Sequence, residues 1–251
     1  VMHRAGVPAE VMQVVLGDGP TIGGALIDSV DHVCFTGSTA TGRMVAQRAA
    51  GRLVGCSLEL GGKNPMIVCA DANVDTAVDI ALHACFTSAG QLCVSTERIY
   101  AHRDSHGELV RRLTARVAAL TLGSEVGWGY DMGTLTTPAQ RDRVLAAINH
   151  AVAQGAVVVT GGAARPDIAP LAVAPTVLTE VAADHDIAEH EVFGPVVFVT
   201  PVADIDEAVR LANDSPYGLS ASVISRNTSA ARRIARRLTT GSVNINEGFA
   251  A

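Results

Sequence analysis

The stretch from residue 32 to residue 51, HVCFTGSTATGRMVAQRAAG, decides the fold. Its apolar beginning, 32–36, predicts a short strand, Gly37 a tight turn, and the pattern at 43–51 a helix. The preceding residues predict a strand at 11–16 and a short helix at 21–29. A strand, a helix, a strand, a turn and a helix in this order are typical of a doubly wound α/β sheet.

The same alternation continues to the end of the chain. We expect strands at 53–60, 66–69, 156–160, 196–200, 219–225 and 242–246, and helices at 71–87, 105–120, 138–154, 204–213 and 228–238. The sequence therefore predicts an α/β protein with two α/β units. The four arginines of the helix at 228–238 are expected on a solvated face.

Composition excludes several classes of function. The chain has 251 residues, of which 48% are hydrophobic, and a net charge of −6, which suits a globular protein. Without a basic run, neither nucleic acid nor a membrane surface is a favoured partner. Apolar stretches stay well below the roughly 18 to 20 residues that a membrane span needs.

The cysteines indicate where the protein works. Their number, five, is odd, and their spacing fits neither a zinc site nor a disulfide framework, so we expect no metal. A reducing cytoplasm is the natural compartment for such a chain. Cys34, Cys56, Cys69 and Cys85 lie in apolar contexts and are expected to be buried.

The first motif that can carry chemistry is Phe35-Thr36-Gly37-Ser38-Thr39-Ala40-Thr41-Gly42. Backbone N–H groups at a helix start can bind a phosphate, and the helix dipole assists. Gly37 permits close approach of a cofactor, and the Ser38 hydroxyl can donate to a pyrophosphate oxygen. The motif is not the usual G-x-G-x-x-G pattern, and a glycine turn that caps a helix explains it equally well.

Two further motifs supply a base and a nucleophile. Glu59 ends a predicted strand before Gly61 and Gly62, whose flexibility lets the carboxylate swing toward a reaction centre, where it can act as a general base. A glutamate beside two glycines is nevertheless usually only part of a turn. Cys93 follows a predicted helix after a break at Gly90, which favours exposure and a reactive thiolate over burial.

The fourth motif pairs Glu191 with Phe193 at the start of a predicted strand. Side chains at i and i+2 of a strand point the same way. Glu191 can accept hydrogen bonds from ribose hydroxyls while Phe193 packs against a flat ring. This pair alone is a weak signal.

Together, and in this order, the four motifs resemble the aldehyde dehydrogenase superfamily. Its marks are F-T-G-S-T-x-x-G, E-L-G-G-K, G-Q-x-C and E-x-F-G-P, and residues 213–221 resemble a further family segment. The resemblance runs along the whole chain and is closest to bacterial succinate-semialdehyde dehydrogenases of the NADP-using kind, through 59–70 and 89–100. It implies that residues 1–61 are the tail of a Rossmann-like NAD(P)-binding domain and that residues 62–251 are the catalytic domain.

The resemblance also implies roles for the residues of the motifs. Cys93 would attack the aldehyde to give a thiohemiacetal, hydride would leave for the nicotinamide of NAD or NADP, and Glu59 would activate the water that hydrolyses the thioester. The Cys93 N–H would be one donor of the oxyanion hole.

Cofactor-binding roles follow in the same way. Gly37 and Ser38 would contact the pyrophosphate, Gly42 would also bind the cofactor, and the Leu60 backbone would lie near the carboxamide. Glu191 would hold the nicotinamide ribose, and Phe193 would place the ring. The implied partner is a small-molecule aldehyde, and the implied parent protein is a cytoplasmic homo-oligomer.

The chain departs from the family pattern in two respects. The family has a longer N-terminal part, with an Asn that completes the oxyanion hole and a Lys-Pro segment that holds the adenosine ribose, and neither segment occurs here. We therefore expect a fragment that is inactive by itself and lacks the extreme C-terminus. Thr87 also stands where some succinate-semialdehyde dehydrogenases have an Arg for the substrate carboxylate, and threonine cannot form that pair.

Three alternatives stay open. The substrate can be another aldehyde. An acylating enzyme would pass the thioester to coenzyme A, although Glu59 argues against it because that chemistry needs no water-activating base. A non-catalytic relative of crystallin type or a truncated pseudoenzyme is the third, although retention of both Cys93 and Glu59 argues against drift.

Overall fold

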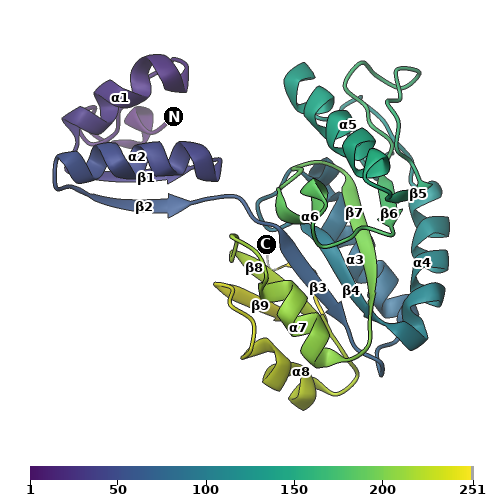
Figure 1. The fold of residues 1–251 in the computed structure, drawn as a ribbon. Helices are drawn as coiled ribbons and strands as arrows, with labels where there is room; N and C mark the ends of the chain where they lie inside the picture. Colours follow the sequence, from purple (N-terminus) through teal and green to yellow (C-terminus); the bar gives the residue numbers. More distant parts are fainter. Residues whose placement is uncertain (250–251) are drawn as a thin grey trace. The chain divides into compact units, whose positions relative to one another are not determined.

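The computed structural model describes residues 1–249. Its contacts divide the chain into two compact units, Val1–Leu60 and Gly61–Ala251. Both units combine helices with parallel strands, which confirms the predicted α/β class (Figure 1).

The first unit contains the motif from which the fold was predicted. Helices α1 (Gly19–Ser29) and α2 (Thr39–Gly51) accompany the parallel strands β1 (His32–Thr36) and β2 (Gly55–Glu59), and a single turn, η1 (His3–Ala5), precedes them. Its small core joins Ile27, Val45 and Ala49 to Val33 and Phe35.

The strand expected at 11–16 does not form. These residues have no regular secondary structure, and Val11, Val14 and Leu16 are exposed. A strand requires hydrogen bonds to a neighbouring strand, and no described segment of this unit offers them at 11–16. The apolar run alone was therefore a misleading signal.

The second unit is built on a seven-stranded sheet with the order β5-β6-β7-β4-β3-β8-β9. Only β5 runs antiparallel to its neighbour, and all other pairs are parallel. The strands in chain order are β3 (Asn64–Val68), β4 (Thr96–His102), β5 (Val157–Thr160), β6 (Thr176–Thr179), β7 (Val196–Val202), β8 (Ser220–Ile224) and β9 (Ser242–Ile245).

Helices cover both faces of this sheet (Figure 1). On one face, Met66 and Val68 of β3 pack with α3 (Val74–Phe86), α4 (Arg103–Ala118) and α5 (Pro138–Ala153). On the other face, Ile67 of β3 packs with α7 (Ile205–Asn213) and α8 (Thr228–Ala235). Successive side chains of a strand point to opposite faces, so β3 contributes to both cores.

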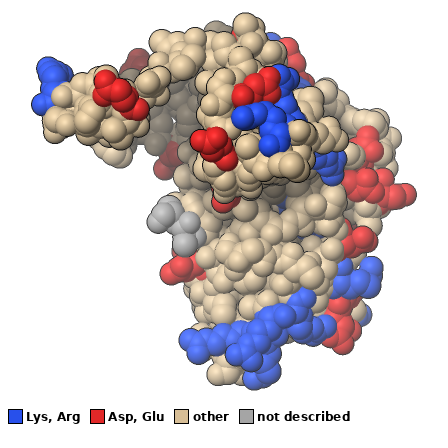
Figure 2. All heavy atoms as spheres, turned by 90° about the vertical axis from the view of Figure 1, so that its left-hand side faces the viewer, with Lys and Arg blue, Asp and Glu red and all other residues tan. Residues whose placement is uncertain are grey.

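The arginine-rich helix has the solvated face that the sequence predicts. Ala231 and Ile234 of α8 are buried, while the arginines are exposed and gather at the bottom of Figure 2. These exposed side chains are Arg232, Arg233, Arg236 and Arg237.

Strand β4 lies at the centre of the sheet, yet the sequence pattern did not reveal it. Its buried residues include Glu97 and Arg98, each at most 3% exposed. Charged residues are almost never fully buried unless they are paired. The partners of Glu97 and Arg98 come from distant parts of the chain, so the local sequence looks unlike an interior strand. The short strand β6 and the one-turn helix α6 (Asp186–Glu189) were also missed.

The topology gathers four chain segments at one edge of the sheet. Residues 61–63, 91–95, 191–195 and 217–219 directly precede β3, β4, β7 and β8. These four strands are neighbours and parallel, so their amino ends meet at the same edge. Two of the motifs singled out in the sequence, around Cys93 and around Glu191, therefore lie there.

Residues 1–249 contain neither a membrane-spanning helix nor a cluster of metal-binding side chains. Among residues 1–249, no helix is both long and apolar enough to span a membrane. No group of three or more His, Cys, Asp or Glu side chains in the same range is arranged to hold a metal ion.

Candidate active site

Cys93 lies in a loop whose backbone takes unusual conformations. After α3, the turn η2 (Thr87–Gly90) places Ser88 and Ala89 in the left-handed region, with φ of 53° and 54°. Gly90 follows with φ of 70°, and a Cβ there would lie 2.1 Å from the carbonyl oxygen of Gly194. Only glycine suits both constraints. The Cys93 loop therefore packs directly against the segment that contains Gly194.

Gln91 ties the start of this loop to a second loop, before α5. Its Nε2 donates to the carbonyl oxygens of Ser88, at 3.0 Å, and Thr134, at 3.3 Å. Its Oε1 accepts from the N–H and the hydroxyl of Thr136, at 3.0 and 3.1 Å. All its polar atoms are thus engaged in holding the loop.

Asn64, which the sequence analysis did not single out, fixes the loop at Cys93 itself. Its Nδ2 donates to the carbonyl oxygens of Cys93 and Ser95, both at 2.8 Å. Its Oδ1 accepts from the N–H of Ser220 at 3.1 Å. A polar side chain at the beginning of an apolar strand was the available signal, because a buried amide must find partners.

The five cysteines differ in accessibility. Cys69 and Cys85 are buried. Burial raises the pKa of the Cys69 thiol to about 11 and also raises the pKa of Cys85 well above its ordinary value. Neither thiol forms a thiolate readily. Cys93 is partly exposed, within a loop held by specific side chains.

The expectation that Cys34 and Cys56 are buried was wrong, because both are exposed. They lie on β1 and β2, a two-stranded sheet whose core holds only a few apolar side chains. Neither cysteine belongs to that core.

Gly62 connects the Cys93 loop with the Glu191 segment. Its N–H donates to Oε1 of Glu191 at 2.9 Å, and a Cβ on Gly62 would lie 2.7 Å from the carbonyl oxygen of Cys93. At Gly61, a Cβ would lie 2.1 Å from Oε2 of Glu191. At Gly62 the Cys93 carbonyl oxygen thus leaves little room for a side chain, and at Gly61 a side chain would displace the Glu191 carboxylate. The sequence alone suggested flexibility as the reason for these glycines.

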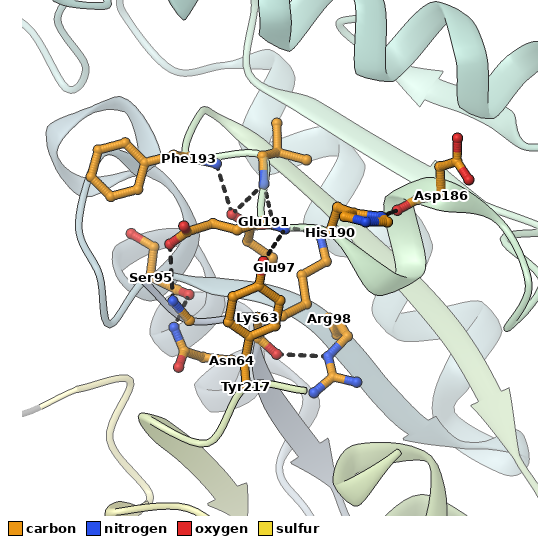
Figure 3. Close-up of polar contacts among 12 residues, drawn as sticks. Lys63, Asn64, Ser95, Glu97, Arg98, Asp186, His190, Glu191, Phe193 and Tyr217 are labelled. Atoms are coloured by element: carbon orange, nitrogen blue, oxygen red, sulfur yellow. Dashed lines mark hydrogen bonds and ion pairs between the residues drawn. The ribbon is translucent and has the colours of Figure 1, made fainter. Parts of the chain in front are cut away.

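Glu191 lies half-buried beside these glycines, at the amino edge of β7 (Figure 3). Burial raises the pKa of its carboxyl, and the hydrogen bond from the Gly62 N–H opposes that shift. Oε1 is engaged with Gly62, which fixes the orientation of the carboxylate.

The backbone that follows Glu191 is held by a buried ion pair. Lys63 and Glu97, 1% and 3% exposed, meet with Nζ 2.5 Å from Oε2. Both oxygens of Glu97 also accept from the N–H of Val192, at 3.1 and 3.0 Å, and Oε1 accepts from that of Phe193 at 2.9 Å. Burial lowers the pKa of Lys63, and the charge of Glu97 opposes that effect.

In the first unit, the glycine turn after β1 is built as the sequence suggested. Ser38 caps α2, because its Oγ accepts from the N–H of Thr41 at 3.2 Å. Gly42 is buried, and a Cβ there would lie 2.5 Å from a methyl group of Leu60. At Gly37 the Phe35 ring leaves no room for a Cβ, since it would lie at 2.5 Å.

Glu59 ends β2 at the same edge of this sheet. Its side chain is exposed, and its carbonyl oxygen accepts from the Gly37 N–H at 3.1 Å. The Gly37 N–H is therefore used inside the fold. Glu59 and Cys93 belong to different units, and their partnership stays a prediction.

The second unit thus holds a partly exposed cysteine in a loop beside the segment with Glu191 and Phe193, and the first unit holds a strand–glycine–helix turn. The aldehyde dehydrogenase family matches residues 1–251. The chain therefore belongs to the aldehyde dehydrogenase family.

Proteins similar to this chain are named after several different aldehydes. A Mycobacterium tuberculosis (strain H37Rv) protein named "Putative succinate-semialdehyde dehydrogenase (NADP(+)) 2" is 48% identical over 250 residues, covering 100% of this chain and 48% of that protein. The 2-hydroxymuconic semialdehyde dehydrogenase of Pseudomonas sp. (strain CF600) is 40% identical, covering 99% of this chain and 53% of that protein. The chain spans about half the length of the curated relatives it matches.

The fold of this chain is also similar to a solved structure of an aldehyde dehydrogenase. Betaine aldehyde dehydrogenase from Staphylococcus aureus in complex with NAD+ is similar with a TM-score of 0.96 and 35% sequence identity. The match covers 100% of this chain and 51% of that protein.

Proposed function

We propose that these residues form the nucleophile-bearing part of an NAD(P)-dependent aldehyde dehydrogenase, with Cys93 as nucleophile and Glu59 as general base. The observation that carries the proposal is the position of Gly62, whose N–H donates to the Glu191 carboxylate and where a Cβ would lie 2.7 Å from the Cys93 carbonyl oxygen. In this proposal, the nucleophile Cys93 and the cofactor-binding Glu191 both lie against the short segment at Gly62.

In this proposal the Cys93 thiolate attacks the carbonyl carbon of the aldehyde, and the carbonyl oxygen becomes an oxyanion. The Cys93 N–H is one donor to that oxyanion, and such donors contribute about 3 kcal/mol each. NAD(P), when bound, supplies the acceptor for the hydride that leaves the same carbon. Glu59 then takes a proton from water, which attacks the resulting thioester, and Cys93 leaves as a thiolate.

The residues present fit a nicotinamide dinucleotide. Glu191 has one carboxylate oxygen fixed by Gly62 and a second that can accept from ribose hydroxyls. Phe193 supplies an aromatic ring two residues on. Gly37, Ser38 and Gly42 lie at the start of α2, whose dipole favours a pyrophosphate, and Leu60 follows β2 directly.

Succinate semialdehyde is the substrate we propose, and either NADP or NAD is the cofactor. The name of the Mycobacterium tuberculosis relative supports both the substrate and NADP, and the Staphylococcus aureus complex supports NAD. Thr87 is a counterargument, because its Oγ1 donates to the carbonyl oxygen of His83 at 2.7 Å and carries no charge. A carboxylate-bearing substrate therefore needs a cation from elsewhere.

The proposal is tested on the full-length natural protein that carries these residues. Formation of NAD(P)H is followed with succinate semialdehyde, 2-hydroxymuconic semialdehyde and betaine aldehyde, each with NAD and with NADP. We expect turnover of succinate semialdehyde to be lost in Cys93→Ala and kept in Cys34→Ser, an exposed cysteine outside the site. Full turnover by Cys93→Ala would refute the proposed mechanism, and preference for another aldehyde would refute the substrate.

The domain roles of residues 1–61 and 62–251, a homo-oligomeric parent protein and a cytoplasmic location stay predictions.

A further inference from the structure

The segment Glu191-Val192-Phe193 has no regular secondary structure, although it contains both residues proposed to hold the nicotinamide end of the cofactor. Phe193 lies in the left-handed region, with φ of 53°, which is unfavourable for an aromatic residue. Such a conformation persists only where the surroundings enforce it. The contacts that enforce it therefore decide where Glu191 and Phe193 lie.

Those contacts come from two buried side chains on different elements. Glu97 of β4 accepts the N–H groups of Val192 and Phe193. Gln140 of α5 donates its Nε2 to the carbonyl oxygens of the same two residues, at 3.0 and 2.7 Å. The N–H and the C=O of both residues are thus hydrogen-bonded, as in a regular sheet, but by side chains.

Both oxygens of Glu97 face hydrogen-bond donors. An ionised carboxylate is a pure acceptor with sites for several donors, and here it serves two N–H groups and the ammonium of Lys63. Lys63 directly follows Gly62, whose N–H orients Glu191. The Lys63–Glu97 ion pair therefore links two backbone segments near Glu191. One is the segment at Gly62, which binds the Glu191 carboxylate, and the other is Val192-Phe193, which follows Glu191 in the chain. Figure 3 shows these contacts converging on Glu97.

A pair of apolar residues would fill this volume without the cost of desolvating two charges. It would leave the N–H groups of Val192 and Phe193 without acceptors. The buried Glu97 carboxylate thus serves as the acceptor for the backbone of Val192 and Phe193.

We propose that Glu97, neutralised by Lys63, is a positioning residue for the nicotinamide end of the cofactor, acting through Glu191 and Phe193. The inference rests on the proposed function, because it presupposes that these two residues bind NAD(P). It assigns no contact between Glu97 and the cofactor or the aldehyde.

The test compares four variants of the full-length natural protein. Glu97→Gln keeps the shape of the side chain but removes one acceptor oxygen. Glu97→Gln with Lys63→Met removes the unpaired charge as well and keeps the side chains long. Glu97→Asp retains the charge on a shorter stem. Glu189→Gln is the matched control, an exposed carboxylate in the nearby helix α6.

Cofactor affinity is measured by NAD(P)H fluorescence, and folding by the midpoint of thermal unfolding. We expect the single and the double variant with Glu97→Gln to bind the cofactor about tenfold or more weakly, because a misplaced binding group loses affinity steeply. The double variant is expected to recover thermal stability but not affinity, while Glu97→Asp recovers part of the affinity. The KM for the aldehyde and the rate of Cys93 alkylation without cofactor are expected to stay within about twofold, since the change acts on cofactor binding.

Hydrogen exchange without cofactor gives a second readout. The amides of Val192 and Phe193 are expected to exchange faster in both variants that carry Glu97→Gln than in the unaltered protein and in Glu189→Gln. Unaltered cofactor affinity in a folded double variant would overturn the inference while leaving the proposed function intact. Failure of the unaltered protein to bind NAD(P) would instead overturn the proposed function, and the inference with it.

Discussion

The side chain of Asn64 donates a hydrogen bond of 2.8 Å to the carbonyl oxygen of Cys93. The same amide group also donates to Ser95, and its oxygen accepts from Ser220. One buried residue at the start of β3 thus joins the Cys93 loop to β8. The position of the Cys93 loop depends on the interior of the sheet and not on the loop alone.

Replacement of Asn64 by Ala is expected to loosen this loop. Two carbonyl groups and one N–H lose their partner, which costs ~2–4 kcal/mol of unfolding free energy. Denaturant unfolding measures this loss, and alkylation of Cys93 by iodoacetamide is expected to become faster. Asn149→Ala, on the exposed face of α5, is the control and is expected to change neither quantity appreciably. Equal stability of the two variants would show that the Asn64 contacts do not hold the loop.

Gly90→Ala tests the contact between the Cys93 loop and the segment at Gly194. The new methyl group would meet the Gly194 carbonyl, and the left-handed backbone adds strain, for a total cost of ~2–4 kcal/mol. Gly107→Ala is the control, since Gly107 lies in α4 with open space around it. That change is expected to stabilise the protein by ~0.5–1 kcal/mol. Thermal unfolding that shifts in the same direction for both variants would contradict the described packing.

Ionisation of Glu191 is expected to affect stability and cofactor affinity in opposite directions: as the pH rises, stability falls and cofactor affinity increases. Its pKa is raised in the folded protein, which therefore binds more protons than the unfolded chain above the ordinary value of 4.5. The stability that Glu191 contributes is complete below that value and is lost as the pH rises through the raised pKa.

Cofactor affinity is expected to rise over the same interval, by about fivefold, because the ionised carboxylate is the stronger acceptor. Fluorescence titrations at several pH values, paired with thermal unfolding, measure both trends. Glu191→Gln should flatten both, whereas Glu189→Gln should leave them unchanged. An affinity that falls with rising pH in the unaltered protein would exclude Glu191 as an acceptor for the ribose.

Local sequence patterns predicted the elements whose residues follow ordinary rules. Strand β3 is apolar throughout its second half, and α5 begins with Thr137 and Pro138, a cap and a favourable first residue. Strand β4 escaped prediction because Glu97 and Arg98 find their polar partners in distant parts of the chain. Glu97 is paired with Lys63, and Arg98 donates to the carbonyl oxygens of Lys63, Leu211 and Ala212.

The residues of the candidate site also divide into those that the sequence pattern predicted and those that it did not. Cys93, Glu191 and Phe193 were singled out because their residue types and spacing suggest chemistry. Asn64, Glu97 and Gln140 were not, because their role is to hold backbone groups that only the folded sheet brings near them. A single sequence contains no local signal for such long-range hydrogen bonds beyond the presence of a polar residue in an apolar setting.

The most direct test of the central claim is mass spectrometry of Glu59→Gln in the full-length natural protein, after a single turnover with NAD(P) and the aldehyde. If Cys93 is the nucleophile and Glu59 the base, hydride transfer occurs but hydrolysis is slow. A peptide that contains Cys93 should then carry the added mass of the acyl group. A steady-state rate equal to that of the unaltered protein, or an acyl group on another residue, would contradict the account.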